Sequence, residues 1–359
     1  MVQTLAPRFF LGANSKAGFF SLYDRFTDPA AGNFLWVIKG SPGCGKSSFM
    51  RRIGAAAECA GLRAEYIHCS GDPDSLDAVC IPERRVAYVD GTAPHVIEPQ
   101  YPGAAALYLD LGSYLDAGAL EAHLDEIAAL NRRYKALYAA AYAQLAAAAA
   151  LLPKNQPGLW TEEMAGALSR RVGAVAAREL KAQKKPAAVT HRFLSADSCK
   201  GRVMLTETLP AYCDRLILLE NAFGLGHAAL SQLAELAAAR GCDAICCHDP
   251  LEPEKLEALL LPELALGFLA VEDADFAPPL PCRRLRLDAL AARHLPPETR
   301  PLLRQRKKES RTLLAAARET LKQAKALHDE LEAVYHPHVD FDGVGALAED
   351  HIRWILDGR

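Results

Sequence analysis

The chain has 359 residues, half of them apolar, and a formal net charge of −3. This length allows two domains with separate hydrophobic cores, and the small net charge gives no electrostatic reason to expect nucleic acid or an anionic membrane as a partner. The ten cysteines lack a C-x-x-C pair, which favours reduced thiols over zinc ligands or disulfides. No signal peptide and no membrane-spanning apolar stretch is recognisable, so we expect a cytoplasmic protein.

The first third of the chain alternates between strand and helix patterns. Strands are predicted over 8–12, 34–38, 64–69, 86–90 and 107–111, and helices over 18–26 and 47–60. The acidic segment 71–77 is expected to begin a further short helix. This alternation predicts an α/β domain with a mostly parallel sheet flanked by helices.

The most specific motif is a glycine-rich loop between the strand 34–38 and the helix that follows. It fits the P-loop pattern G-x-x-x-x-G-K-[ST] in the expected strand-loop-helix setting. Its glycines let backbone N–H groups turn toward a phosphate, and the helix N-terminus adds its positive dipole end. Lys46 would reach the β/γ-phosphates of ATP and Ser47 would ligate Mg²⁺. The residues expected to bind the nucleotide are Gly40, Ser41, Pro42, Gly43, Cys44, Gly45, Lys46, Ser47 and Ser48.

Three further residues are candidates for the chemistry. Asp90 ends an apolar strand and fits the aspartate that holds Mg²⁺ beside a P-loop, the alternative being a turn aspartate before Gly91. No glutamate follows Asp90, so the base that would activate water is not obvious. Asp72 is the candidate base, with capping of a helix as an equal interpretation. His95 is a further candidate near the γ-phosphate.

Two long helical segments, 119–152 and 301–335, each end at a proline-containing turn and continue into a shorter helix. We expect these arms, about 119–180 and 300–357, to pack on each other or on the sheets. A protein partner or self-association through the arms is the alternative. The basic run over 300–311 is interpreted as a solvated helix face, the alternative being a phosphate contact or an arginine finger that reaches the first domain.

The chain repeats itself with a spacing near 180 residues, which predicts a tandem duplication. The segment 10–15 recurs at 193–198, and 68–83 recurs at 248–263. The second copy has lost the groups that would touch phosphate or metal: Gly40, Lys46, Ser47 and Asp90 correspond to Asn221, His227, Ala228 and Ala270. We therefore predict a P-loop domain over 1–183 and a degenerate P-loop-like domain over 184–359, each with its helical arm.

Four segments, 10–20, 38–48, 68–77 and 90–95, resemble a family of bacterial, largely clostridial-type tandem P-loop ATPases. The resemblance covers nearly the whole chain. It implies two fused P-loop domains and ATP as the nucleotide, although many members keep a P-loop in the second copy. The order of elements is also similar to RecA- and KaiC-like ATPases, which place catalytic glutamates where this chain has Ser70 and Gly71.

These patterns together predict a Mg²⁺-dependent ATP-binding protein that hydrolyses ATP slowly at one site, in its first copy. Lys46 and Asp72 are the candidate catalytic residues, and Ser47 and Asp90 the candidate metal ligands. One alternative is a small-molecule or nucleotide kinase with a lid formed by Arg132 and Arg133. The other is a non-catalytic scaffold in which ATP sets the angle between the domains.

Overall fold

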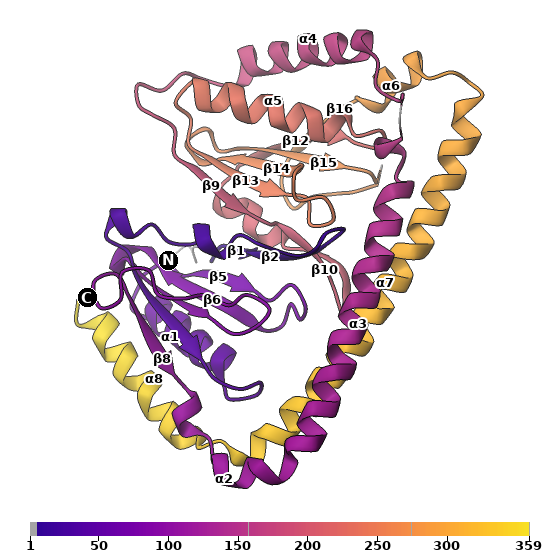
Figure 1. Cartoon of the computed structure of the whole chain (residues 1–359). Coiled ribbons are helices and arrows are strands. Elements are labelled where there is room, and N and C mark those ends of the chain that lie inside the picture. Colours follow the sequence, from indigo (N-terminus) through magenta and orange to yellow (C-terminus); the bar gives the residue numbers. More distant parts are fainter. Residues whose placement is uncertain (1–5, 157, 274, 359) are drawn as a thin grey trace.

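A computed structural model describes residues 6–156, 158–273 and 275–358. It is a mixed α/β protein with two six-stranded sheets, one from each sequence copy, each flanked by helices (Figure 1). The expected pair of mostly parallel sheets is therefore confirmed. The first five residues, which bear on the expected absence of a signal peptide, lie outside the described residues.

The first sheet has the strand order β1-β5-β6-β7-β4-β8. Only β6 runs antiparallel to its neighbours. In chain order the strands are β1 (Arg8–Phe10), β4 (Phe34–Lys39), β5 (Glu65–His68), β6 (Leu76–Ile81), β7 (Val86–Asp90) and β8 (Ala106–Asp110).

The second sheet repeats this topology, with the order β9-β13-β14-β15-β12-β16 and β14 as the antiparallel strand. Its strands are β9 (Val189–Arg192), β12 (Arg215–Glu220), β13 (Ala244–His248), β14 (Leu256–Leu261), β15 (Leu266–Val271) and β16 (Cys282–Leu285). Each strand thus has its counterpart at the same place in the other sheet, which supports the duplication read from the sequence.

The prediction of a helix is wrong for two segments. The segment 18–26 forms β3 (Gly18–Ser21), which pairs with β2 (Gly12–Ser15) in a hairpin. Gly18 adopts φ +100°, a left-handed conformation suited to a tight hairpin turn. The segment 71–77 is a turn that leads into β6, because Ser75 N–H bonds back to Asp72 O and reverses the chain. The second copy has the matching hairpin of β10 (Ser195–Ser198) and β11 (Gly201–Met204).

The two copies meet across an approximate twofold relationship. Phe10 and Phe193, which are equivalent in the repeat, exchange two backbone hydrogen bonds of 2.9 Å. Nearby, Asn14 Nδ2 donates to the carbonyl oxygen of Asp197, its own equivalent, at 2.9 Å. Both phenylalanines are fully buried in a hydrophobic core to which both sheets contribute. The domains therefore form one packed unit.

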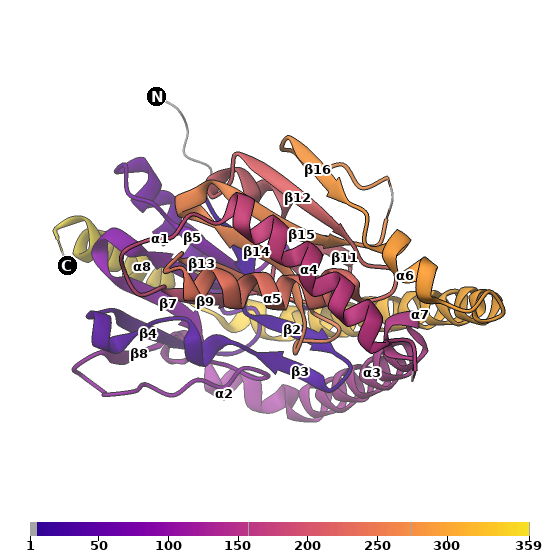
Figure 2. The same cartoon turned by 90° about the horizontal axis from the view of Figure 1, so that it is seen from above.

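The long helices exchange between the copies. α3 (Leu124–Leu151) and α7 (Thr299–Tyr335) lie side by side along one side of the molecule (Figures 1 and 2). Beyond α3, α4 (Glu162–Glu179) packs on α5 (Leu225–Ala239) of the second copy. Beyond α7, α8 (Phe341–Leu356) packs on α1 (Lys46–Cys59) of the first copy. Each domain core is thus completed by a helix from the other copy.

The remaining helices are short. They are α2 (Ala117–Leu120), α6 (Asp288–His294) and the 3-10 turns η1 (Tyr23–Arg25), η2 (Pro29–Ala31), η3 (Pro82–Arg84), η4 (Gly112–Tyr114), η5 (Glu121–His123), η6 (Pro153–Asn155), η7 (Thr206–Ala211), η8 (Pro262–Leu264) and η9 (His336–His338).

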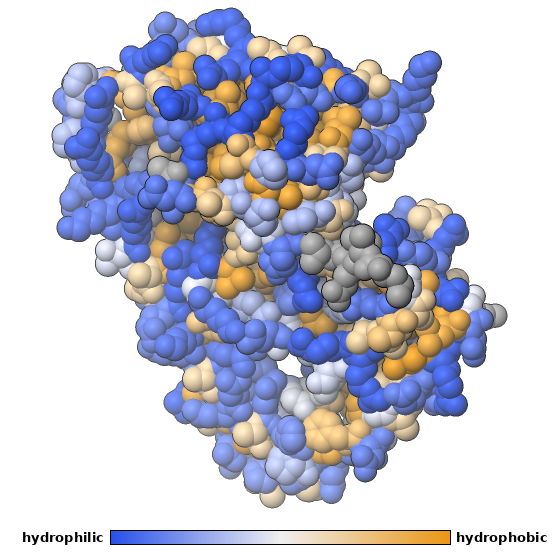
Figure 3. Space-filling view, turned by 180° about the vertical axis from the view of Figure 1, so that it is seen from behind, coloured by the Kyte–Doolittle hydropathy of each residue, from blue (hydrophilic) through white to orange (hydrophobic). Residues whose placement is uncertain are grey.

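Hydrophilic side chains dominate the face of the molecule in Figure 3, with hydrophobic side chains in separate groups between them. Within the described part of the chain, no helix combines the length and apolar character needed to cross a membrane.

Candidate functional site

The glycine-rich loop 40–47 joins the end of β4 to the start of α1. Gly43 and Gly45 adopt φ +72° and +92°, conformations that favour glycine. α1 begins at Lys46, and no side chain caps its N-terminus. Because the first N–H groups of a helix have no intrahelical partner, this end of α1 is suited to an anion.

Lys46 lies beside Asp90 at the ends of two neighbouring parallel strands. Its Nζ donates to Gly40 O at 3.2 Å and to Ser41 O at 2.8 Å, and lies 3.7 Å from Asp90 Oδ2. The other carboxylate oxygen of Asp90 accepts from Thr92 N at 2.8 Å and from Thr92 Oγ1 at 2.6 Å. Asp90 therefore holds the turn after β7 with one oxygen and faces Lys46 with the other.

The remaining loop side chains divide between the core and the surface. Ser47 Oγ accepts from Leu76 N at 2.9 Å, which ties α1 to the start of β6, and Ser48 is exposed. The Cys44 side chain is fully buried in the core beneath the loop, and burial raises its pKa. A Cβ atom on Gly40 would lie 2.5 Å from Cys44 Sγ, so Gly40 gives this thiol its space.

Asp72 is engaged in the turn that precedes β6. Oδ1 accepts from Asp74 N at 3.2 Å, and Oδ2 accepts from Ser75 Oγ at 3.0 Å and lies 3.4 Å from Lys325 Nζ. The first two contacts are those of a turn-capping aspartate. The third connects Asp72 to α7.

His95 belongs to a cluster of buried polar side chains inside the first domain. Its Nδ1 donates to Thr92 O at 2.8 Å, and its Nε2 lies 3.4 Å from Asp77 Oδ2. Asp77 also accepts from Tyr23 OH at 2.6 Å, and burial raises the pKa of this carboxyl. His95 is thus connected to Asp90 through Thr92, and its imidazole packs against Tyr23 and Phe19.

The end of α7 and the start of α8 cover the glycine-rich loop, which sequence reasoning missed. A Cβ atom on Gly43 would lie 3.2 Å from the carbonyl oxygen of Glu332, and one on Gly45 would lie 3.7 Å from Phe341 and from Val344. The second copy therefore contributes to the surroundings of the first copy's loop. The two arms hold equivalent positions in the repeat, so the sequence alone does not show which loop each arm covers.

The equivalent loop of the second copy has a different conformation. Gly224, which corresponds to Gly43, keeps a left-handed φ of +81°, but α5 begins at the next residue, Leu225. α1 begins two positions later in the repeat, at Lys46, which corresponds to His227. Asn221 Oδ1 accepts from His227 N at 3.1 Å, where Gly40 stands in the first copy. In the second copy, helical residues therefore stand where the first copy has a turn that could surround a phosphate.

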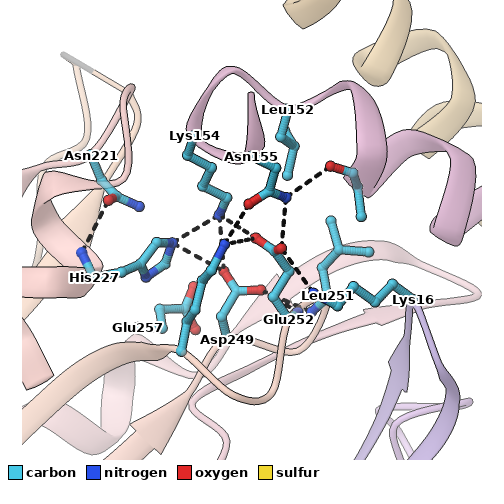
Figure 4. Close-up of polar contacts among 12 residues, drawn as sticks. Lys16, Leu152, Lys154, Asn155, Asn221, His227, Asp249, Leu251, Glu252 and Glu257 are labelled. Atoms are coloured by element: carbon cyan, nitrogen blue, oxygen red, sulfur yellow. Dashed lines mark hydrogen bonds and ion pairs between the residues drawn. The ribbon is translucent and has the colours of Figure 1, made fainter. Parts of the chain in front are cut away.

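Lys154, from the turn after α3, enters this second loop (Figure 4). Its side chain is 4% exposed, and its Nζ donates to His227 Nε2 at 2.8 Å. Three carboxylates surround the ammonium: Glu252 at 3.3 Å, Asp249 at 3.8 Å and Glu272 at 3.9 Å. Burial would lower the pKa of Lys154, but these carboxylates raise it above its ordinary value.

His227 is neutral in this cluster. Burial, and then the Lys154 ammonium, lower its pKa to about 4. Its Nδ1 donates to Leu256 O at 2.7 Å, which leaves Nε2 as the acceptor for Lys154. The residue that replaced Lys46 is therefore a hydrogen-bond acceptor for a lysine from the other copy. A cavity of about 230 Å³ beside it is lined by Lys154, Trp160, Gly224, His227, Ala228, Ser231 and Lys255.

The basic residues considered from the sequence as an arginine finger or a kinase lid lie on α7 and α3. At the start of α7, Arg300 donates to Ala292 O and Lys307 lies 3.9 Å from Glu272, so these residues of the basic run contact the second copy. The run therefore starts beside the second domain, at the opposite end of α7 from Glu332. Arg132 and Arg133 are exposed on α3.

Comparison with protein-family models, with curated proteins and with solved structures found no match to this chain in any of the three.

Proposed function

We propose that the first copy binds Mg·ATP at the glycine-rich loop 40–47. One observation carries this proposal: Gly43 and Gly45 form a left-handed turn that leads into α1, whose N-terminus has no side-chain cap. Lys46 and Asp90 lie together beside this turn. A phosphate accepted by such a helix start gains backbone N–H donors and the positive end of the dipole. Lys46 would exchange its two carbonyl partners for phosphate oxygens.

The oxygen ligands near Lys46 suit Mg²⁺. The Ser47 hydroxyl accepts from Leu76 N at 2.9 Å and from Arg51 Nη2 at 3.5 Å, so a cation would take the place of the longer contact. Asp90 Oδ2 has the Lys46 ammonium beside it, and this ammonium would move toward the phosphates. Hard oxygen donors together with phosphate oxygens are the usual surroundings of protein-bound Mg²⁺. These residues would hold the metal, which supplies charge neutralisation at the phosphates.

Slow hydrolysis of ATP is the reaction that we propose for this site. A scaffold gated by ATP is the second candidate, and the contact of Glu332 with Gly43 favours it, because nucleotide at the loop would act directly on an arm from the other copy. Kinase activity has less support, since Arg132 and Arg133 are exposed on α3.

Isothermal titration with ATP and Mg²⁺ tests the proposal. We expect one site per chain, loss of binding in Lys46→Ala, and binding close to wild type in the matched variant of the second copy, His227→Gln. Two equal sites, or binding that survives Lys46→Ala and is lost in His227→Gln, would overturn it. An arm-gated scaffold would bind ATP in the same way without releasing phosphate.

A further inference from the structure

One face of α7 brings three charged or titratable side chains to the glycine-rich loop and the turn after β5 of the first domain. Lys325, His328 and Glu332 follow the spacing i, i+3, i+7, which places them along one side of a helix. The backbone of Glu332 contacts Gly43, and Lys325 Nζ lies 3.4 Å from Asp72 Oδ2. His328 lies between Lys325 and Glu332 on the same face of α7, and the charge of Lys46 is near enough to act on its imidazole.

His328 and Glu332 form a pair. His328 Nδ1 lies 3.6 Å from Glu332 Oε1, and the imidazole packs against Tyr134 of α3 with 5.6 Å between ring centroids. This arrangement holds the ring and directs Nδ1 toward the carboxylate. In a neutral imidazole whose Nδ1 carries the proton, Nε2 is a proton acceptor.

Charged groups from two elements and an aromatic ring from a third surround His328. Lys325, Asp329 and Glu332 come from α7, Lys46 comes from the loop, and Tyr134 covers the ring from α3. Burial lowers the pKa of His328 below its ordinary value, and Lys325 and Lys46 act in the same direction against Glu332 and Asp329. The imidazole is consequently neutral at pH 7.

We infer that the His328–Glu332 pair of α7 is the base of the first site, which lacks a glutamate after Asp90. The inference rests on the proposed function. The attacking water gives one proton to His328 Nε2 while its oxygen bonds to the γ-phosphorus of ATP. The bond from that phosphorus to the bridging oxygen breaks, and ADP leaves with the electron pair. Glu332, whose Oε1 lies 3.6 Å from Nδ1, is a positioning residue that stabilises the imidazolium.

Steady-state ATPase rates and ATP titrations on His328→Gln and Glu332→Gln test this assignment. His294→Gln is the matched control, because His294 Nδ1 of the second copy also lies 3.6 Å from a glutamate, Glu163 of α4. We expect His328→Gln to lower kcat by about 10²-fold or more with ATP affinity unchanged, in the range of general base catalysis. His294→Gln should leave both unchanged.

The pH profile separates a positioning role of Glu332 from a structural one. Since a base must be unprotonated, kcat of the wild type should fall as the pH drops through the pKa of His328. Glu332 raises that pKa, so Glu332→Gln should move the acid limb of the profile to lower pH. An acid limb at the same pH in both proteins would contradict the role given to Glu332.

Three outcomes would overturn the inference while leaving the proposed nucleotide site intact. They are unchanged turnover in a folded His328→Gln variant, loss of ATP affinity instead of turnover, and a wild type that binds ATP without releasing phosphate. Absence of ATP binding in the wild type would instead show that the proposed function fails.

Discussion

Glu332 and Lys154 occupy matching positions over the two glycine-rich loops and carry opposite charges. A Cβ atom on Gly43 would lie 3.2 Å from the Cβ of Glu332, and one on Gly224 would lie 2.9 Å from the Cβ of Lys154. The first loop keeps its own lysine and meets a carboxylate from the arm. The second loop has lost its lysine and receives one from the arm. The first loop thus keeps its own cation, whereas the second is neutralised inside the protein by a lysine from the arm of the first copy.

Lys154→Met tests how much this neutralisation contributes to stability. The change would leave Asp249, Glu252 and Glu272 without their shared ammonium. Breaking a buried ion pair by removing one partner costs about 3–5 kcal/mol. Because Lys16 and Lys255 stay beside Glu252 and Arg202 stays near Asp249, we expect a loss toward the lower end of this range in the free energy of unfolding measured with urea.

The control is Lys184→Met at an exposed lysine, which should change stability little. ATP binding at the first loop should persist in both variants at a temperature where both are folded. A loss below about 1 kcal/mol in Lys154→Met would show that the cluster tolerates an apolar replacement.

Asp90→Asn should weaken Mg²⁺-dependent binding or turnover of ATP. An amide can still hold the turn through Thr92, so the effect should come from the oxygen that faces Lys46. Titration of Mg²⁺ at fixed ATP measures it. Asp110→Asn is the matched control, because Asp110 ends β8 of the same sheet and accepts from Gly112 N at 2.7 Å in a similar turn. Equal effects of the two changes would count against a metal-binding role of Asp90.

Much of the architecture could be predicted from local patterns in the sequence. The glycine-rich loop, the strand that ends at Asp90 and the duplication are all visible as short motifs or as equivalences between copies. The antiparallel strand β6 was missed because its acidic approach, 71–77, looks like a helix start. Its pairing with β5 and β7 depends on the rest of the sheet. The helix expected over 18–26 failed because the left-handed Gly18 and the packing of Phe20 on Phe193 favour a hairpin.

The exchange of α4 and α8 could not be predicted, for a physical reason. An apolar stripe shows that a helix packs on another element of the protein. It does not show whether α4 or α8 packs on α1 or on α5, because these two helices are equivalent in the two copies. The same limit hid Glu332 and Lys154, which reach the loops only through the exchange.

Asp72→Asn should have a small effect on turnover. The carboxylate holds the turn before β6 through Asp74 N and Ser75 Oγ, and an asparagine can keep one of these contacts. We expect a stability loss of about 1 kcal/mol or less, the usual effect of a weakened cap. Thermal unfolding and ATPase rates on the same preparation measure both. A fall in kcat of about 10²-fold at unchanged ATP affinity would make Asp72, in place of His328, the base.

His227→Gln should reduce the sensitivity of the fold to mild acid. The pKa of His227 is lowered from its ordinary value of 6.5 to about 4 in the folded protein, so the unfolded chain takes up its proton first as the pH falls. The contribution of His227 to the free energy of unfolding is complete above its pKa in the unfolded chain. It is lost as the pH falls from 6.5 to 4. From pH 7 to pH 5 the shift corresponds to about 2 kcal/mol. Glutamine does not titrate, so urea unfolding at these two pH values should show a drop smaller by that amount in His227→Gln than in the wild type. Equal drops in both proteins would mean that His227 is protonated as readily in the folded state as in the unfolded chain, and that its hydrogen bond to Lys154 does not depend on a neutral imidazole.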